Sequence, residues 1–223
     1  YLSNNSWSFA GGNGTIILNE QCFQYFYDDK GRTTWKKSPG AEPLKMLYDV
    51  RDRVVLMQDG NQAALTTPQW TANIYDELDR PVISTLYNTS ASTTVLQTDI
   101  NNAPVSNTVT INNAGTVSVT AKTHLNPISS GNLNNSSVTT VLTYQFYDNY
   151  SFNAVKTFNT NYTNLNAYNT SDPNVQAIAK TQRTTSFPTG SMTRVMNSTQ
   201  FLSSTQYYDE RGSLIQSLKD NIK

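Results

Sequence analysis

The chain repeats the stretch Tyr48-Asp49-Val50-Arg51-Asp52-Arg53 in four variants along its 223 residues. Each copy follows a short apolar or aromatic run and precedes another, as Val54-Val55-Leu56-Met57 follows Arg53. A turn-forming stretch between two such runs predicts a β-hairpin. The other three copies are Tyr27-Asp28-Asp29-Lys30-Gly31-Arg32, Tyr75-Asp76-Glu77-Leu78-Asp79-Arg80 and Tyr208-Asp209-Glu210-Arg211-Gly212-Ser213.

The turn chemistry explains the spacing inside each copy. An Asp at the first position of a type I turn accepts hydrogen bonds from backbone N–H groups, and the residue three positions later must adopt the left-handed conformation. Gly31 and Gly212 adopt it freely, and Asp52 and Asp79 occupy the same position in the other copies. Asp tolerates a positive φ better than most residues, so the substitution supports the hairpins.

The Tyr of each copy should end the incoming strand, and an Arg should begin the outgoing strand in three of the four copies. A contact between Tyr and Arg across the two strands is therefore expected. These arginines are Arg32, Arg53 and Arg80.

Between Pro81 and Gln206 the motif becomes rare, and Asn, Thr and Ser dominate with alternating β-branched residues. Residues 109–120 predict a hairpin that turns at Asn112-Asn113-Ala114-Gly115. Residues 138–147 predict a strand that leads to Tyr147-Asp148-Asn149-Tyr150, a degenerate copy because residue 151 is neither Gly nor Asp.

Helix signals are scarce, and one short helix is expected at most. It would span residues 172–180, with Asp172 as N-cap and Pro173 at the first helical position. The sequence thus predicts an all-β fold: a twisted antiparallel sheet or ribbon of Tyr-Asp hairpins.

Composition excludes several classes of function. The 16 basic and 16 acidic residues cancel, so the chain lacks the positive charge of a nucleic-acid binder. Charged residues make up 14%, below the roughly 25% of an average domain, and uncharged polar residues replace them, as in β-proteins outside the cytoplasm. No apolar stretch is long enough for a membrane helix, and no leader opens the chain, which starts at Tyr1 and is expected to be a piece of something longer.

Residues suited to catalysis are few. The single cysteine, Cys22, cannot form an internal disulfide and is expected to be a small buried hydrophobe on a strand. The single histidine, His124, has no companion at a metal-ligand spacing, and no Gly-x-Ser-x-Gly motif occurs. No metal, cofactor or catalytic residue is predicted, and the chain is not expected to be an enzyme.

Acidic and aromatic residues leave two alternatives open. A glycosidase needs a pair of carboxylates, but most acids here serve the predicted turns, and Glu20, Glu42 and Asp99 stand apart from them. The tryptophans Trp35 and Trp70 could stack on sugar rings if they share an exposed face, although aromatic residues on strands more often form core or cross-strand pairs.

The linked motifs resemble the Rhs, or YD-repeat, family of bacterial surface and secreted proteins. The first matching region runs from about Cys22 to Arg80, and the second from about Thr193 to Asn221. Besides the four Tyr-Asp copies, the resemblance rests on Cys22-Phe23-x-Tyr25, Lys37-x-Pro39-Gly40-Ala41-Glu42-Pro43, Val55-Leu56-x-Gln58-Asp59-Gly60-Asn61, Pro81-Val82 and Thr193-Arg194-Val195.

The resemblance implies a β-sheet that winds as a ribbon and in complete members encloses a shell, often around a toxin domain, while other members act in adhesion or carbohydrate contact. Residues 1–90 would form a YD-repeat hairpin region, residues 91–192 an Asn/Thr/Ser-rich β insert, and residues 193–223 a C-terminal hairpin, together one continuous β-domain. The Gly212-Ser213 pair departs from the usual Gly-Arg.

Three functions remain in order. The first is a non-catalytic scaffold module of a secreted or surface protein, partnered by the remainder of its parent chain and by any toxin domain it sequesters. The second is a carbohydrate-binding or adhesive module that contacts glycans through Trp35 and Trp70. The third is a glycoside hydrolase-like enzyme.

Overall fold

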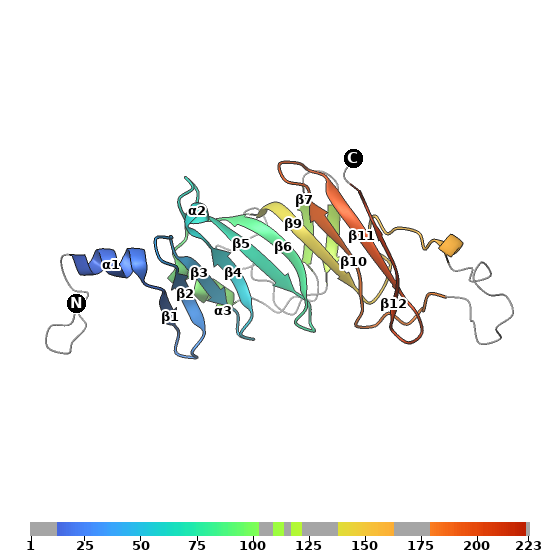
Figure 1. The fold of residues 1–223 in the computed structure, drawn as a ribbon, viewed down its shortest axis with the longest axis horizontal. Coiled ribbons are helices and arrows are strands. Elements are labelled where there is room, and N and C mark those ends of the chain that lie inside the picture. Colours follow the sequence, from blue (N-terminus) through green and yellow to red (C-terminus); the bar gives the residue numbers. More distant parts are fainter. Residues whose placement is uncertain (1–12, 103–108, 114–116, 122–137, 163–178, 222–223) are drawn as a thin grey trace.

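The computed structural model describes residues 13–102, 109–113, 117–121, 138–162 and 179–221. It confirms the predicted all-β fold: ten strands form one antiparallel sheet, in the order β1-β2-β3-β4-β5-β6-β9-β10-β11-β12 (Figure 1). The strands are β1 (Gln24–Tyr27), β2 (Thr33–Lys37), β3 (Leu44–Tyr48), β4 (Val54–Gln58), β5 (Gln69–Tyr75), β6 (Pro81–Asn88), β9 (Val138–Tyr147), β10 (Pro188–Arg194), β11 (Phe201–Tyr208) and β12 (Leu214–Lys219).

Two predictions for the middle of the chain are also confirmed. The hairpin near residue 112 is β7 (Val109–Asn113) paired with β8 (Val117–Ala121), and the strand predicted over 138–147 is β9. Because β9 pairs with both β6 and β10, the region expected to be an insert contributes a central strand to the sheet.

Helices are more numerous than the single one predicted. They are α1 (Asn13–Gln21), α2 (Gly60–Ala63) and α3 (Thr93–Asn101), with one 3-10 turn, η3 (Thr160–Tyr162). The Ser92 hydroxyl accepts from the Val95 N–H at the start of α3, and Asp59 and Gln62 form a capping box at α2. The helix predicted over 172–180 lies almost wholly outside the described residues, as does His124.

All four Tyr-Asp copies form the predicted hairpin turns. In the first, the Gly31 N–H donates to the Asp28 carbonyl at 2.9 Å and the Asp28 N–H to the Arg32 carbonyl at 3.0 Å, and the other copies repeat both bonds. The predicted left-handed residues have φ of 77° at Gly31, 63° at Asp52, 64° at Asp79 and 81° at Gly212. The pairing register also shifts just before each Tyr, a bulge that increases the local twist.

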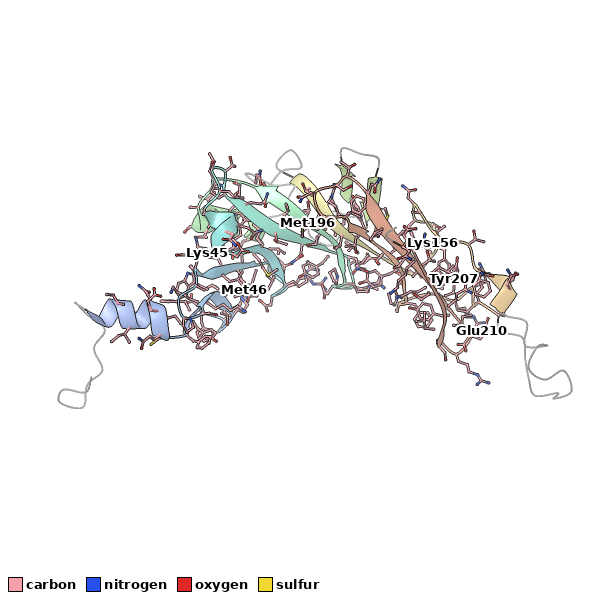
Figure 2. All side chains as sticks on the ribbon, turned by 45° about the horizontal axis from the view of Figure 1, so that its top comes forward. Lys45, Met46, Lys156, Met196, Tyr207 and Glu210 are labelled. Carbon is pink, nitrogen blue, oxygen red and sulfur yellow. The ribbon has the colours of Figure 1, made fainter. Side chains whose placement is uncertain are left out.

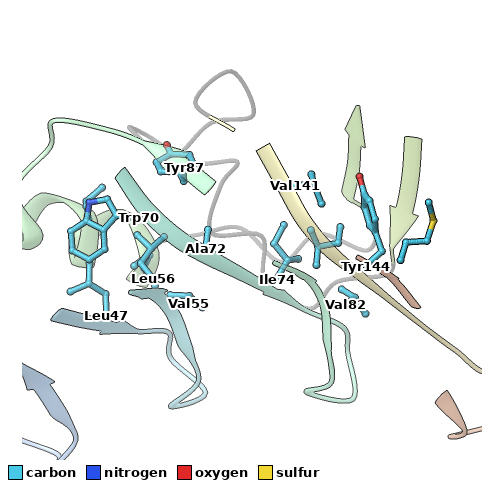
Figure 3. Close-up of a cluster of buried hydrophobic side chains, with 14 residues drawn as sticks. Leu47, Val55, Leu56, Trp70, Ala72, Ile74, Val82, Tyr87, Val141 and Tyr144 are labelled. Carbon is cyan, nitrogen blue, oxygen red and sulfur yellow. The ribbon is translucent and has the colours of Figure 1, made fainter. Parts of the chain in front are cut away.

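One face of the sheet carries the core. Strand alternation places Trp70, Ala72 and Ile74 of β5 on this face, all at most 2% exposed (Figure 3). Leu96 and Ile100 of α3 are fully buried in the same cluster. The β7–β8 hairpin lies behind the sheet beside α3 in Figure 1.

The opposite face is mostly polar. Neighbouring strands bring together Thr71 with Leu86, Ser84 with Thr143, and Ser191 with Ser204, whose hydroxyls lie 2.8 Å apart. The sheet is therefore a single curved layer with one apolar and one polar face, elongated across its strands (Figure 2). Among the described residues, no helix is long and apolar enough to cross a membrane.

Candidate functional site

The motif aspartates organise their own hairpins. In all four copies the first carboxylate oxygen accepts two backbone N–H groups, from the second and fourth residues that follow, at 2.8–3.0 Å. In three copies the second oxygen accepts the arginine Nε at 2.7 Å. Each of these carboxylates is therefore fully engaged within its hairpin.

The arginines also join each hairpin to the next. Arg32 Nη1 lies 2.6 Å from Asp52 Oδ1, and Arg53 Nη1 lies 2.7 Å from Asp79 Oδ1. Arg80 forms a bidentate pair with Asp148, at 3.1 and 2.7 Å. The left-handed Asp thus has a second role that sequence reasoning missed, because it is the acceptor for the preceding hairpin's arginine.

The motif tyrosines complete each junction. The guanidinium carbons of Arg32, Arg53 and Arg80 lie 4.6, 4.7 and 4.2 Å from the ring centroids of Tyr48, Tyr75 and Tyr147. The Tyr48 hydroxyl donates to the Thr33 carbonyl, Tyr75 to Val54, and Tyr147 to Pro81. The expected Tyr–Arg contact therefore exists, but it joins successive hairpins instead of the two strands of one hairpin. We call these three junctions the Arg–Asp–Tyr ladder.

The electrostatics of the ladder keep its acids charged. The hydrogen bond from Arg80, with support from the Ser186 N–H, lowers the pKa of Asp148, and Asp148 in turn raises the pKa of Arg80. Hydrogen bonds from Lys30 and Arg32 likewise lower the pKa of Asp52. Burial raises the pKa of the ring-stacked tyrosines, which therefore remain protonated donors near neutral pH.

The degenerate copy at Tyr147 ends the ladder. Asp148 itself has a φ of 69°, and its N–H donates to the Phe187 carbonyl at 3.1 Å, the bond that Asp28 makes to Arg32 in a complete hairpin. Phe187 therefore occupies the arginine position. Its ring lies 4.7 Å from that of Tyr208, whose hydroxyl donates to the Pro188 carbonyl, so an aromatic pair replaces the cation at this junction.

The glycine at residue 212 matches that replacement. A Cβ at Gly212 would lie 2.9 Å from the Phe187 ring, so the ring occupies the space that the Asp52 and Asp79 side chains have in the other hairpins. Asp thus occurs at the left-handed position where an arginine arrives, and Gly occurs where a phenylalanine does. The missing arginine at Ser213 leaves Asp209 with only its backbone partners in the described structure.

The two tryptophans lie in different environments. Trp70 is 2% exposed within the core, so no glycan can stack on it, which corrects the expectation of a shared glycan face. Trp35 is partly exposed and packs against Phe26, with ring centroids 4.9 Å apart and planes at 87°. It borders a cavity of about 770 Å³ whose other walls include Glu20, Glu42 and Lys37.

Other candidate residues form no catalytic centre in the described part of the chain. Cys22 is partly exposed and lies between α1 and β1, not on a strand as expected. No group of three or more His, Cys, Asp or Glu side chains within the described ranges could hold a metal ion. Glu20 and Glu42, which the sequence left apart, meet at the Trp35 cavity because α1 and the β2–β3 loop converge there.

Comparison with known proteins adds no identity to this geometry. No protein-family model matches the chain, and no curated protein matches it significantly.

Proposed function

We propose that this chain is a non-catalytic structural module of a secreted or surface protein of the Rhs/YD-repeat kind. Its role is to form part of the wall of a shell or scaffold. The observation that carries the proposal is the Arg–Asp–Tyr ladder. It uses the ionisable side chains of the motif to lock neighbouring hairpins together, so these groups hold shape instead of facing a substrate.

The ladder suits a wall because it resists sliding between hairpins. Each arginine binds its own aspartate, the next hairpin's carboxylate and the next hairpin's aromatic ring, and so fixes distance and register at once. Arg53 is only 8% exposed, which shields its ion pairs from solvent. A sheet of one layer needs such links, since its polar face has no second layer packed on it among the described residues.

The natural partner of this module is further chain from its parent protein. β1 and β12 are the two edges of the ten-stranded sheet, and a continuous wall would extend the strand pairing beyond both. Hydrogen–deuterium exchange tests this directly. In the isolated chain the amides of β1 and β12 should exchange faster than those of β5 and β6, whereas in the full-length parent protein the edge amides should become protected.

The internal strands β5 and β6 are the control, because they are paired on both sides in either case. Edge amides that exchange at the same rate in the parent and in the isolated chain would refute the wall. Loss of protection in β5 and β6 would instead mean that the chain does not fold as an independent sheet.

A further inference from the structure

The cavity beside Trp35 lies where the apolar face of the sheet loses its cover. α3 packs its buried residues over β3, and residues 149–162 lie over β11 and β12, where the Tyr150 ring stacks on Tyr207 at 4.6 Å. Register places Phe26, Trp35 and Lys45 on this same face. Phe26 is nevertheless 59% exposed, so the apolar face continues beyond its covering elements into solvent.

The cavity is held open by backbone contacts from α1. The Asn19 carbonyl accepts from Lys37 Nζ at 2.7 Å and from the Gly40 N–H at 3.0 Å, and Gln24 Nε2 donates to the Leu18 carbonyl at 2.9 Å. These bonds fix the end of the helix against β2 and the following loop. They place the Glu20 side chain at one wall, while Glu42 lines the other.

We propose that this cavity binds a neutral saccharide. Two nearly perpendicular aromatic rings offer apolar surfaces against which the C–H face of a sugar ring can lie. Two carboxylates and the Gln24 amide provide acceptors for sugar hydroxyls. A volume of about 770 Å³ is in the range that accommodates small ligands.

The charges select against other ligands of this size. Two carboxylates face a single ammonium, Lys37, which is already bound to the Asn19 carbonyl, so an anionic ligand such as a phosphate or an acidic sugar is repelled. An apolar ligand would leave the carboxylates without hydrogen bonds. The saccharide site goes beyond the structural role and does not depend on it.

Isothermal titration of the complete chain against a panel of neutral and acidic mono- and oligosaccharides tests the site. A neutral saccharide should bind, and Phe26→Ser should weaken that binding about tenfold, because one aromatic wall is lost. Trp35→Ala should abolish it. Phe26 is mostly exposed, so its replacement should leave the melting temperature almost unchanged even if Trp35→Ala impairs folding.

Tyr25→Ser is the matched control, since Tyr25 is the neighbouring residue of β1, is 52% exposed and does not line the cavity. It should bind the saccharide as the original chain does. The proposal is overturned if no neutral saccharide binds, if acidic sugars bind more tightly than neutral ones, or if Tyr25→Ser and Phe26→Ser weaken binding equally.

Discussion

At the scale of the residue, the motif aspartate combines two demands that usually conflict. Asp49 is 2% exposed, yet it remains stable inside the sheet because its two oxygens accept bonds from two backbone N–H groups and from Arg53. A buried carboxylate is costly unless every lone pair finds a donor, and the turn supplies those donors from its own backbone. The local turn therefore creates the site, and the arginine completes it.

Asp49→Asn should lower the free energy of unfolding by about 3 kcal/mol, because it leaves the buried Arg53 without its main counter-ion. Urea denaturation followed by circular dichroism measures the change. Asp209→Asn is the matched control: Asp209 makes the same turn bonds but has Ser213 in the arginine position, so the loss should be about 1 kcal/mol. Equal losses in the two variants would contradict a special role for the ion pair.

At the scale of the element, hairpins recognise one another through one pair of positions. Arg with Asp forms the junction in three places, and Phe187 with Gly212 forms it in the fourth. The two solutions are mutually exclusive, since a phenylalanine ring needs the space of the missing side chain and an arginine needs its carboxylate. Junction chemistry is thus decided between hairpins, not within them.

A double-mutant cycle tests this exchange. Phe187→Arg alone places a cation beside a glycine, and Gly212→Asp alone places a carboxylate against an aromatic ring, so each should destabilise the sheet. The double variant should recover at least about 1 kcal/mol relative to the sum of the single losses. Gly31→Asp is the control, because nothing lies within 4 Å of its added Cβ and only the backbone cost at positive φ should appear. Strict additivity would show that the two positions do not communicate.

At the scale of the whole molecule, several carboxylates make the folded state sensitive to acid. The pKa of Asp52, Asp148 and Asp220 is lowered by hydrogen bonds from Lys30, Arg80 and Lys156, respectively, and for Asp220 it falls to about 2. A carboxylate whose pKa is lower in the folded state contributes stability above its unfolded pKa of 3.8. That contribution is lost as the pH falls through the folded value.

The urea midpoint should therefore be nearly constant from neutral pH to about pH 5 and should then fall steadily toward pH 2. Asp220→Asn should flatten the lower part of this profile, because the bonds from Lys156 and Ser203 no longer depend on a charge. Measuring the midpoint at each pH for both proteins checks the slope. A variant profile parallel to the original between pH 4 and pH 2 would rule out Asp220 as a contributor.

The sequence by itself determined the hairpins, because their chemistry is local. A turn aspartate, a left-handed Gly or Asp three residues later and flanking apolar runs are close in the chain, so the four turns, the β7–β8 pair and β9 were all predictable. Even the exchange of Asp and Gly at the left-handed position was visible, although its cause was not. The capping signals of α2 and α3 were present too, but the Asn- and Thr-rich composition obscured them.

Only the tertiary structure decided what the hairpins do to one another. Arg80 and Asp148 are 68 residues apart, Phe187 takes an arginine's place across a long excursion, and Glu20 meets Glu42 and Trp35 only because α1 docks on β2. The burial of Trp70 and the exposure of Phe26 likewise depend on which part of the apolar face α3 covers. Such contacts arise from the packing of distant segments, and no spacing along the chain encodes them.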